Sequence, residues 1–337
     1  YSPRQFWPVN ALSFVAVTPA AYSAVTANTT SSASGEVSIA SDVTIPTNVT
    51  NQKDLMYAAI MSATKGTDGI VPLTFQHALS QIVFKGKFNN AGAVTKVVIK
   101  DITLMNIRNA GTINFRSTAA VSPAVIDGTF PAITWPGTQT YANYQLEASD
   151  LEVSTLNGVV WVASDAAEYG IATAANKIDT YEDVDYATTH DALLLSSNVG
   201  KIYKFQDCYK KVAYDTEAKD LTISNSTTKP TDANPGNAWM LLPQTLDGTG
   251  TLVKAGGSAP TDGKAYLRIS ARLEKDGVVI LNDTDPIYIP VGTTWERGKK
   301  YVYTIEFNGS GALTPINFSV AAEDWTDADS QLDDVSM

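Results

Sequence analysis

The chain has 337 residues, of which 44% are hydrophobic and 18% charged, and its formal net charge is -11 at pH 7. This length allows two domains that each bury a core, and the low share of charged residues argues against a disordered chain. The negative charge disfavours nucleic acid and anionic lipid as partners, because their phosphates repel an acidic protein. The single cysteine, Cys208, excludes an internal disulfide and a cysteine-based metal cage.

In the first half of the chain, alternation of apolar and polar residues predicts a series of strands. Residues 54–61 are the best candidate for a helix, which would have one or two turns at most. Polar segments rich in Ser and Thr, such as residues 28–35, are expected to be loops at the ends of a β-sandwich. The strands are expected at residues 11–17, 71–75, 81–87, 95–107, 112–115 and 141–146.

The second half begins irregularly and ends in clear strand patterns. Residues 147–237 mix short apolar runs with long polar stretches, which indicates loop insertions. Residues 265–273 alternate and are followed by Asp276-Gly277 and an apolar run, which predicts a hairpin because both turn residues tolerate a positive φ. Two more strands are expected at residues 301–307 and 316–320. The sequence therefore predicts an all-β protein.

A turn-rich stretch near Pro136 suggests a boundary between two domains. We place the N-terminal β-sandwich domain at residues 1–148. The C-terminal β-sandwich domain would cover residues 149–337 and carry the long loop insertions.

The candidates for a catalytic or metal site are weak. His77 shares an apolar face with Leu73 and Phe75, so it is expected to be a packed residue. His190 ends an acidic stretch, residues 179–191, which lacks the glycine and the closing glutamate of a calcium-binding loop. We expect a solvated loop there, with a cation site as the alternative.

Motifs for catalysis are also missing from the sequence. There is no nucleophile elbow, phosphate-binding glycine loop, zinc motif or dinucleotide fingerprint. Carboxylate pairs such as Asp283 and Asp285 leave a glycosidase-like hydrolase as the least favoured hypothesis. The sequence therefore predicts a protein that is not an enzyme and that has no cofactor and no metal.

Six segments of the chain resemble one known family. Residues 73–80 match the pattern L-x-F-x-H-A-L-S, and residues 295–303 match W-x-x-G-x-x-Y-x-Y. In chain order, the six segments are residues 6–16, 54–58, 71–82, 240–244, 295–305 and 316–320, the last followed by Trp325. Together they resemble the fimbrillin-like family of the Bacteroidales, the subunits of type V pili and their relatives.

The resemblance implies two transthyretin-like β-sandwich domains in tandem. It also implies an exported lipoprotein precursor whose lipidated cysteine lies upstream of Tyr1, so that only this anchor would contact the outer membrane. The expected location is the cell surface, in a fimbrium. Pilins of this family polymerise by strand exchange, in which cleavage after an arginine removes a first strand and another subunit donates a strand to the vacated groove.

Two sets of residues are candidates for this assembly. Arg4 is the arginine near the start of the chain and is the candidate processing site. Ile316, Phe318 and Val320 alternate along the last strand and are the candidate strand-exchange residues. The tail after Trp325 is acidic and lacks clean alternation, which favours a tip or accessory adhesin over a repeating shaft subunit. The expected partners are other pilin subunits and host or bacterial surface glycans or proteins.

A surface glycan-binding module that does not polymerise is the alternative function. Four aromatic residues lie in polar surroundings and could stack on sugar rings. They are Trp161, Tyr169, Tyr181 and Tyr186. The competing interpretation is that they belong to the core and rim of a sandwich.

Overall fold

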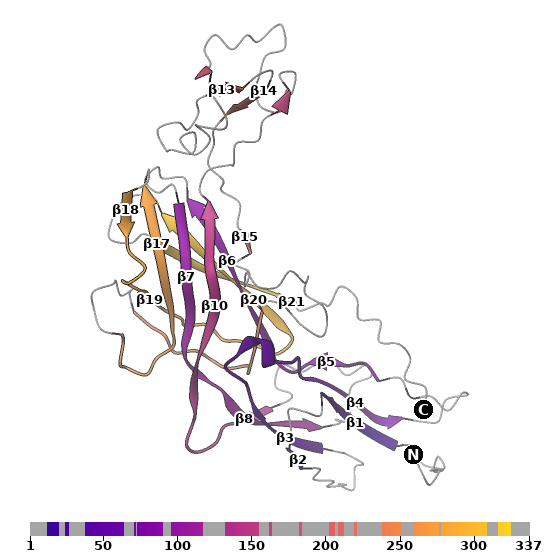
Figure 1. Ribbon diagram of the computed structural model, residues 1–337. Helices are drawn as coiled ribbons and strands as arrows, with labels where there is room; N and C mark the ends of the chain where they lie inside the picture. The colour runs from indigo at the N-terminus through magenta and orange to yellow at the C-terminus, as the bar shows by residue number, and fades with distance from the viewer. Residues whose placement is uncertain are drawn as a thin grey trace.

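The computed structural model is nearly all β (Figure 1). The part that the structure describes forms strands and one 3₁₀ turn, Val49–Asn51, which confirms the predicted fold class. The described residues are 12–19, 24–26, 38–63, 71, 73–89, 96–116, 132–154, 162–163, 182–183, 202–205, 208–211, 219–220, 238–250, 259–275, 278–308 and 316–324.

One of the two largest sheets is antiparallel throughout and has β7 and β17 at its centre. β10 pairs with the outer side of β7, and both β18 and β19 pair with the far side of β17. The predicted hairpin is confirmed, because β17 and β18 are antiparallel neighbours. The strands are β7 (Lys96–Arg108), β10 (Tyr141–Ser154), β17 (Tyr266–Lys275), β18 (Val278–Leu281) and β19 (Ile287–Pro290).

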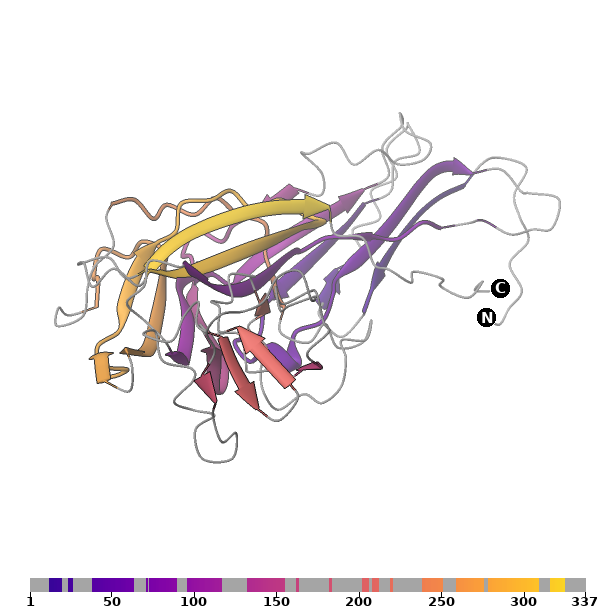
Figure 2. The same cartoon turned by 90° about the horizontal axis from the view of Figure 1, so that it is seen from above.

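The other large sheet has β6 and β20 at its centre, and these two strands run parallel. β15 and β16 pair with the free side of β6, while β21 pairs antiparallel with β20 and forms the edge. Figure 2 shows β20 and β21 side by side along one flank of the molecule. The strands are β6 (Ser80–Asn89), β15 (Lys219–Asp220), β16 (Trp239–Leu241), β20 (Lys299–Asn308) and β21 (Ile316–Asp324).

Three smaller sheets complete the described structure. One contains β1 (Leu12–Thr18), β4 (Met56–Ala63) and β5 (Gln76–His77). Another contains β2 (Ala24–Thr26), β3 (Ser38–Thr44), β8 (Ala110–Arg116) and β9 (Ala132–Thr134). The third contains β11 (Val162–Ala163), β12 (Glu182–Asp183), β13 (Ile202–Phe205) and β14 (Cys208–Lys211).

Both large sheets contain strands from either side of residue 148. β7 pairs with β17, β6 pairs with β20, and β10 itself extends across residue 148. The predicted division into domains at 1–148 and 149–337 stays a prediction, and the hydrogen-bonded sheets of this structure join the two segments.

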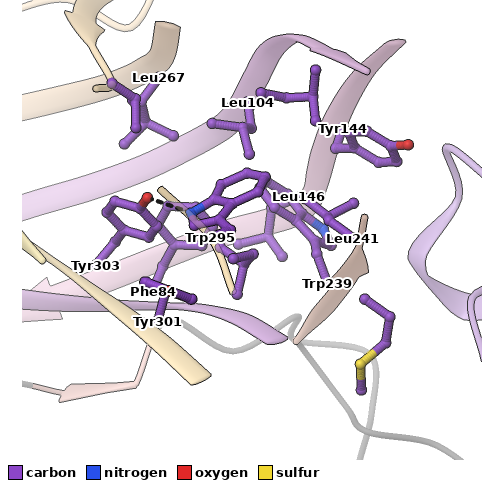
Figure 3. Close-up of a cluster of buried hydrophobic side chains, with 14 of the residues drawn as sticks. Phe84, Leu104, Tyr144, Leu146, Trp239, Leu241, Leu267, Trp295, Tyr301 and Tyr303 are labelled. Atoms are coloured by element: carbon purple, nitrogen blue, oxygen red, sulfur yellow. Dashed lines mark hydrogen bonds between the residues drawn. The ribbon is translucent and has the colours of Figure 1, made fainter. Parts of the chain in front are cut away.

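The two large sheets face each other across a core rich in aromatic side chains (Figure 3). Phe84 of β6 meets Trp239 edge-on, with ring centroids 5.0 Å apart, and stacks on Tyr303 at 5.7 Å. Trp239 also contacts Tyr144 of β10, at 6.3 Å, so the cluster links one sheet to the other. Aromatic pairs at such distances add to the stabilisation from burial alone.

Two of the segments that carry the family resemblance meet at the edge of this core. Gly298 has a φ of 63° and donates its backbone N–H to the carbonyl of Leu79 at 2.8 Å. Ser80 donates its hydroxyl to the carbonyl of Glu296, and the Glu296 N–H is donated to the Tyr301 hydroxyl, each at 2.8 Å. Glycine is suited to position 298 because side chains rarely adopt a positive φ. These motif residues therefore hold two distant segments of chain together.

Two predictions of secondary structure were wrong. Residues 54–61 were expected to be a helix, but Met56–Ala63 form β4, which pairs with β1 on one side and β5 on the other. A helix of so few residues is marginal by itself, so hydrogen bonding to two neighbouring strands decides its conformation. Residues 71–75 were expected to be a strand. The described residues of this range form none, and the next strand along the chain is β5.

His77 is a packed residue, as expected. Its side chain is 11% exposed, and its Nδ1 lies 2.5 Å from the carboxylate of Asp54, which is 15% exposed. The pair connects β5 to the loop before β4. The pair has the features of a structural contact, because both side chains are mostly buried and link two separate segments of the chain.

Tyr303 provides a pH-dependent prediction. Burial raises the pKa of its phenol from 10.0 to about 12, although hydrogen bonds with Trp295 and Thr293 act in the opposite direction. The unfolded chain therefore releases this proton at a lower pH than the folded chain. The free energy of unfolding should be unaffected below about pH 10 and should fall by about 2–3 kcal/mol as the pH rises to about 12.

Urea denaturation over this alkaline range would measure the effect. The Tyr303→Phe variant is the control, since it lacks the titrating group and should show a shallower dependence on pH. If the free energy of unfolding falls equally with pH in both proteins, the effect does not come from Tyr303. The other buried tyrosines, whose pKa values are also raised, contribute equally to both slopes.

Candidate assembly edge

The predicted strand-exchange residues lie at alternate positions of β21. Their register partners on β20 are Phe307 for Ile316, Ile305 for Phe318, and Tyr303 for Val320. Directly paired residues of antiparallel strands project to the same face of a sheet. Val320 therefore projects to the face that carries Tyr303.

The core covers β20 but does not cover β21 at this point. Tyr303 is 1% exposed, whereas its register partner Val320 is 40% exposed. Every residue from 319 to 324 is exposed, and this stretch includes both faces of the strand. The apolar side chain of Val320 thus lies beside the core without a second layer above it.

The outer edge of β21 has no partner strand within the described part of the chain. Backbone N–H and C=O groups along such an edge can pair with another extended chain. β21 has nine residues and pairs with β20 in a register without shifts. It therefore offers a regular template for an added strand.

The other edge strands are less suited to this role. β10 has two register shifts against β7, and β1 has one against β4, and such irregularities disrupt a ladder. β18 has only four residues. Val15 and Val17 of β1 are also packed against the core. Among the described edges, β21 combines length, regular register and exposure.

Two ion pairs hold one end of β21 on β20. Lys299 pairs with Asp324, and Lys300 pairs with Glu323, with 3.7 Å between Nζ and Oε2 in the second pair. The hydrogen bond to Asp324 raises the pKa of Lys299. Such exposed pairs are screened by solvent and add little stability, but they favour one register. This pairing was not predicted from the sequence, although like charges at adjacent positions of both strands were a visible signal.

Several predicted residues lie outside the described part of the chain. These are Arg4, the four aromatic residues of the glycan-binding alternative, and the tail after Asp324. β1 begins at Leu12, so a cut after Arg4 would leave β1 on the chain. Within residues 179–191 only β12 is described, without side chains, so the cation-binding alternative stays a prediction.

The described residues contain neither a candidate metal cluster nor a candidate membrane-spanning helix. No group of three or more His, Cys, Asp or Glu side chains in this part of the chain could hold a metal ion. Within the same residues there is no helix with the length and apolar character needed to cross a membrane.

The chain is similar to several proteins of known structure. A fimbrial protein from Bacteroides vulgatus is 16% identical, with a TM-score of 0.46 over 96% of this chain and 80% of that one. A protein from Bacteroides uniformis proposed to act in cell adhesion is 16% identical, with a TM-score of 0.37 over 95% and 75%. Another such protein, from Parabacteroides distasonis, is 13% identical, with a TM-score of 0.35 over 94% of both chains.

Membership of a family is shown by the amino-acid sequence rather than by the solved structures. No curated protein matches the chain. The family profile described as fimbrillin-like matches residues 1–325, which is nearly the whole sequence. The chain belongs to the fimbrillin-like family.

Proposed function

We propose that this protein is a fimbrial or accessory adhesive subunit of the bacterial cell surface, and that it joins other pilin subunits by adding a strand along β21. The observation that supports this most is the regular and exposed edge of β21 at Val320, which pairs with no further strand among the described residues. Family membership supports a structural role, so we propose that the protein is not an enzyme. Anchoring to the outer membrane would come from a lipid on an upstream segment of the precursor.

The chemistry of such a contact is β-augmentation. A strand from a partner subunit would hydrogen-bond to the open backbone groups of β21, and its apolar side chains would cover Val320 and extend the core. If the donor strand comes from a different surface of the partner, the contact is head-to-tail and builds filaments. The strand exchange implied by the family resemblance is different, because a donated strand there replaces a first strand that cleavage has removed. That exchange would use an edge other than β21.

The position in a fibre is part of the proposal. The acidic, unpatterned sequence after residue 325 is a poor donor strand. We therefore favour a tip or accessory position, in which the subunit accepts a strand at β21 without donating its own C-terminal residues.

A charge placed on the exposed edge tests the proposal. We expect Val320→Lys to reduce multimer formation at least about tenfold, because a partner strand would have to bury the ammonium group beside the core. The fold should remain, since exposed substitutions change stability by about 0.5 kcal/mol or less. Crosslinking of the purified protein and electron microscopy of surface fibres in cells that express the full precursor would measure assembly.

Val279→Lys is the matched control. Val279 is 43% exposed, close to the 40% of Val320, and it also lies on an edge strand, β18. The control variant should assemble like the unmodified protein. Normal fibres with Val320→Lys, or equal losses with both variants, would exclude β21 as the assembly edge.

A further inference from the structure

A cationic side chain at the end of β7 has an unusual environment in this acidic protein. The guanidinium carbon of Arg108 lies 5.1 Å from the ring centroid of Trp135. Among the described residues, no carboxylate pairs with this guanidinium and no acceptor hydrogen-bonds to it. A guanidinium held over an indole ring is attracted to the ring by its charge, and this contact uses none of its N–H donors.

The backbone beneath Arg108 is held firmly. The buried amide of Gln244 accepts a hydrogen bond from the N–H of Arg108 and donates one to its carbonyl, both at 3.1 Å. Trp135 packs against the core and lies over Gly111, where a Cβ atom would be 3.4 Å from two ring carbons. Arg108 and Trp135 are therefore positioned before any ligand binds, which lowers the entropic cost of binding.

The neighbouring strand places an aromatic residue next to this pair. Tyr141 is the register partner of Arg108, so both side chains project to the same face of the sheet. Tyr141 is 52% exposed, and its hydroxyl donates to Oε1 of Gln139 at 2.8 Å. β7 and β10 lie side by side in Figure 1.

Exposed amides continue the same face of β10. Asn143 and Gln145 follow Tyr141 at alternate positions and are exposed. Oδ1 of Asn143 accepts the N–H of Asn106, which orients the side-chain NH₂ group of Asn143 away from that contact. This end of the face thus presents the guanidinium of Arg108, the exposed ring of Tyr141 and the two amides, while the guanidinium of Arg268 on β17 pairs with Asp101.

We propose that Arg108, Trp135 and Tyr141 form a binding site for a carboxylate-bearing saccharide. The planar guanidinium pairs with a carboxylate through two parallel hydrogen bonds. The exposed ring of Tyr141 can stack on the apolar face of a sugar, and the amides can bond to its hydroxyl groups. The site lies on a different sheet from β21 and goes beyond the proposed assembly function.

The arrangement favours a saccharide over an acidic peptide. A peptide that binds a sheet gains most from open backbone groups at a strand edge. The side chains here stand on the face of the sheet, and the backbone N–H and carbonyl of Arg108 are already bonded to the side-chain amide of Gln244. A face of this kind offers side-chain contacts alone.

Titration calorimetry on the full chain would test the site with two pairs of probes. One pair is oligogalacturonate and its methyl ester, and the other is sialyllactose and lactose. We expect saturable binding of at least one carboxylated probe, and at least about tenfold weaker binding of its neutral partner. Arg108→Gln should weaken the binding of the acidic probe by about tenfold or more, and Tyr141→Ala should also weaken it.

Arg272→Gln is the matched control, because Arg272 is an exposed arginine on β17 that already pairs with Glu274 at 2.7 Å. It should bind the probe like the unmodified protein. The proposal is overturned if no acidic probe binds, if acidic and neutral probes bind equally, or if Arg108→Gln keeps full affinity. Stronger binding of a glutamate-rich peptide than of either saccharide would also overturn it. If Arg108→Gln fails to fold, an unchanged affinity in the exposed Tyr141→Ala variant would be decisive against the site.

Discussion

Replacing Trp295 with alanine is expected to lower the free energy of unfolding by about 3–5 kcal/mol. The indole is 2% exposed and lies in the centre of the aromatic core (Figure 3). Its Nε1 donates a hydrogen bond of 2.8 Å to the Tyr303 hydroxyl. Alanine would leave a cavity and would remove the hydrogen bond that the indole donates to the buried Tyr303 hydroxyl, and both effects destabilise the folded state. Urea denaturation followed by circular dichroism would measure the change.

A double-mutant cycle separates the hydrogen bond from the packing. Trp295→Phe and Tyr303→Phe each remove the hydrogen bond while they keep most of the apolar volume. The two changes should be non-additive by about 0.5–1.5 kcal/mol, the usual worth of such a bond. A loss below about 1 kcal/mol for Trp295→Ala would show that the core is not packed as described.

Replacing Gly248 with alanine is expected to destabilise the fold by about 3 kcal/mol or more. A Cβ atom at this position would overlap the backbone nitrogen and oxygen of Val291 and the backbone oxygen of Ala265. These atoms already make two backbone hydrogen bonds of 3.0 Å, from Gly248 to Val291 and from Val291 to Ala265. The obstacle is the backbone itself, so no change of side-chain rotamer relieves it.

Gly137→Ala is the control for this prediction. No atom lies within 4 Å of a Cβ placed at Gly137, which is exposed in the turn before β10. Its thermal midpoint should stay close to that of the unmodified protein, while that of Gly248→Ala should fall clearly. Similar midpoints for the two variants would mean that the segment around Gly248 lies elsewhere.

Much of the strand content could be predicted from local pattern. Residues 265–273 and 301–307 were expected to be strands; β17 contains all of the first range except residue 265, and β20 contains the whole of the second. Both strands bury one set of alternate side chains, so their period of two is strong. The prediction failed at residues 54–61, where small and apolar residues suit a helix as well as a strand.

The strand that we propose as the assembly edge was located in part from the sequence. The alternation of Ile316, Phe318 and Val320 indicated a final strand, and β21 confirms it. Its exposure on the outside of β20 could not be predicted, because alternation does not show where a covering sheet ends. The contact between Arg108 and Trp135 could not be predicted from the sequence. Trp135 belongs to the turn-rich stretch near Pro136, where no strand pattern relates it to Arg108.

The sequence by itself determined the all-β class, the family and the absence of familiar catalytic motifs, because these depend on local alternation and short motifs. Only the tertiary structure decided which strands are neighbours. β6 pairs in parallel with β20, more than two hundred residues later in the chain, and β7 pairs with β17. An alternating pattern specifies which face of a strand is buried, but long-range pairing depends on how all faces pack together. For the same reason, only the folded chain shows that β21 forms an exposed edge among the described strands.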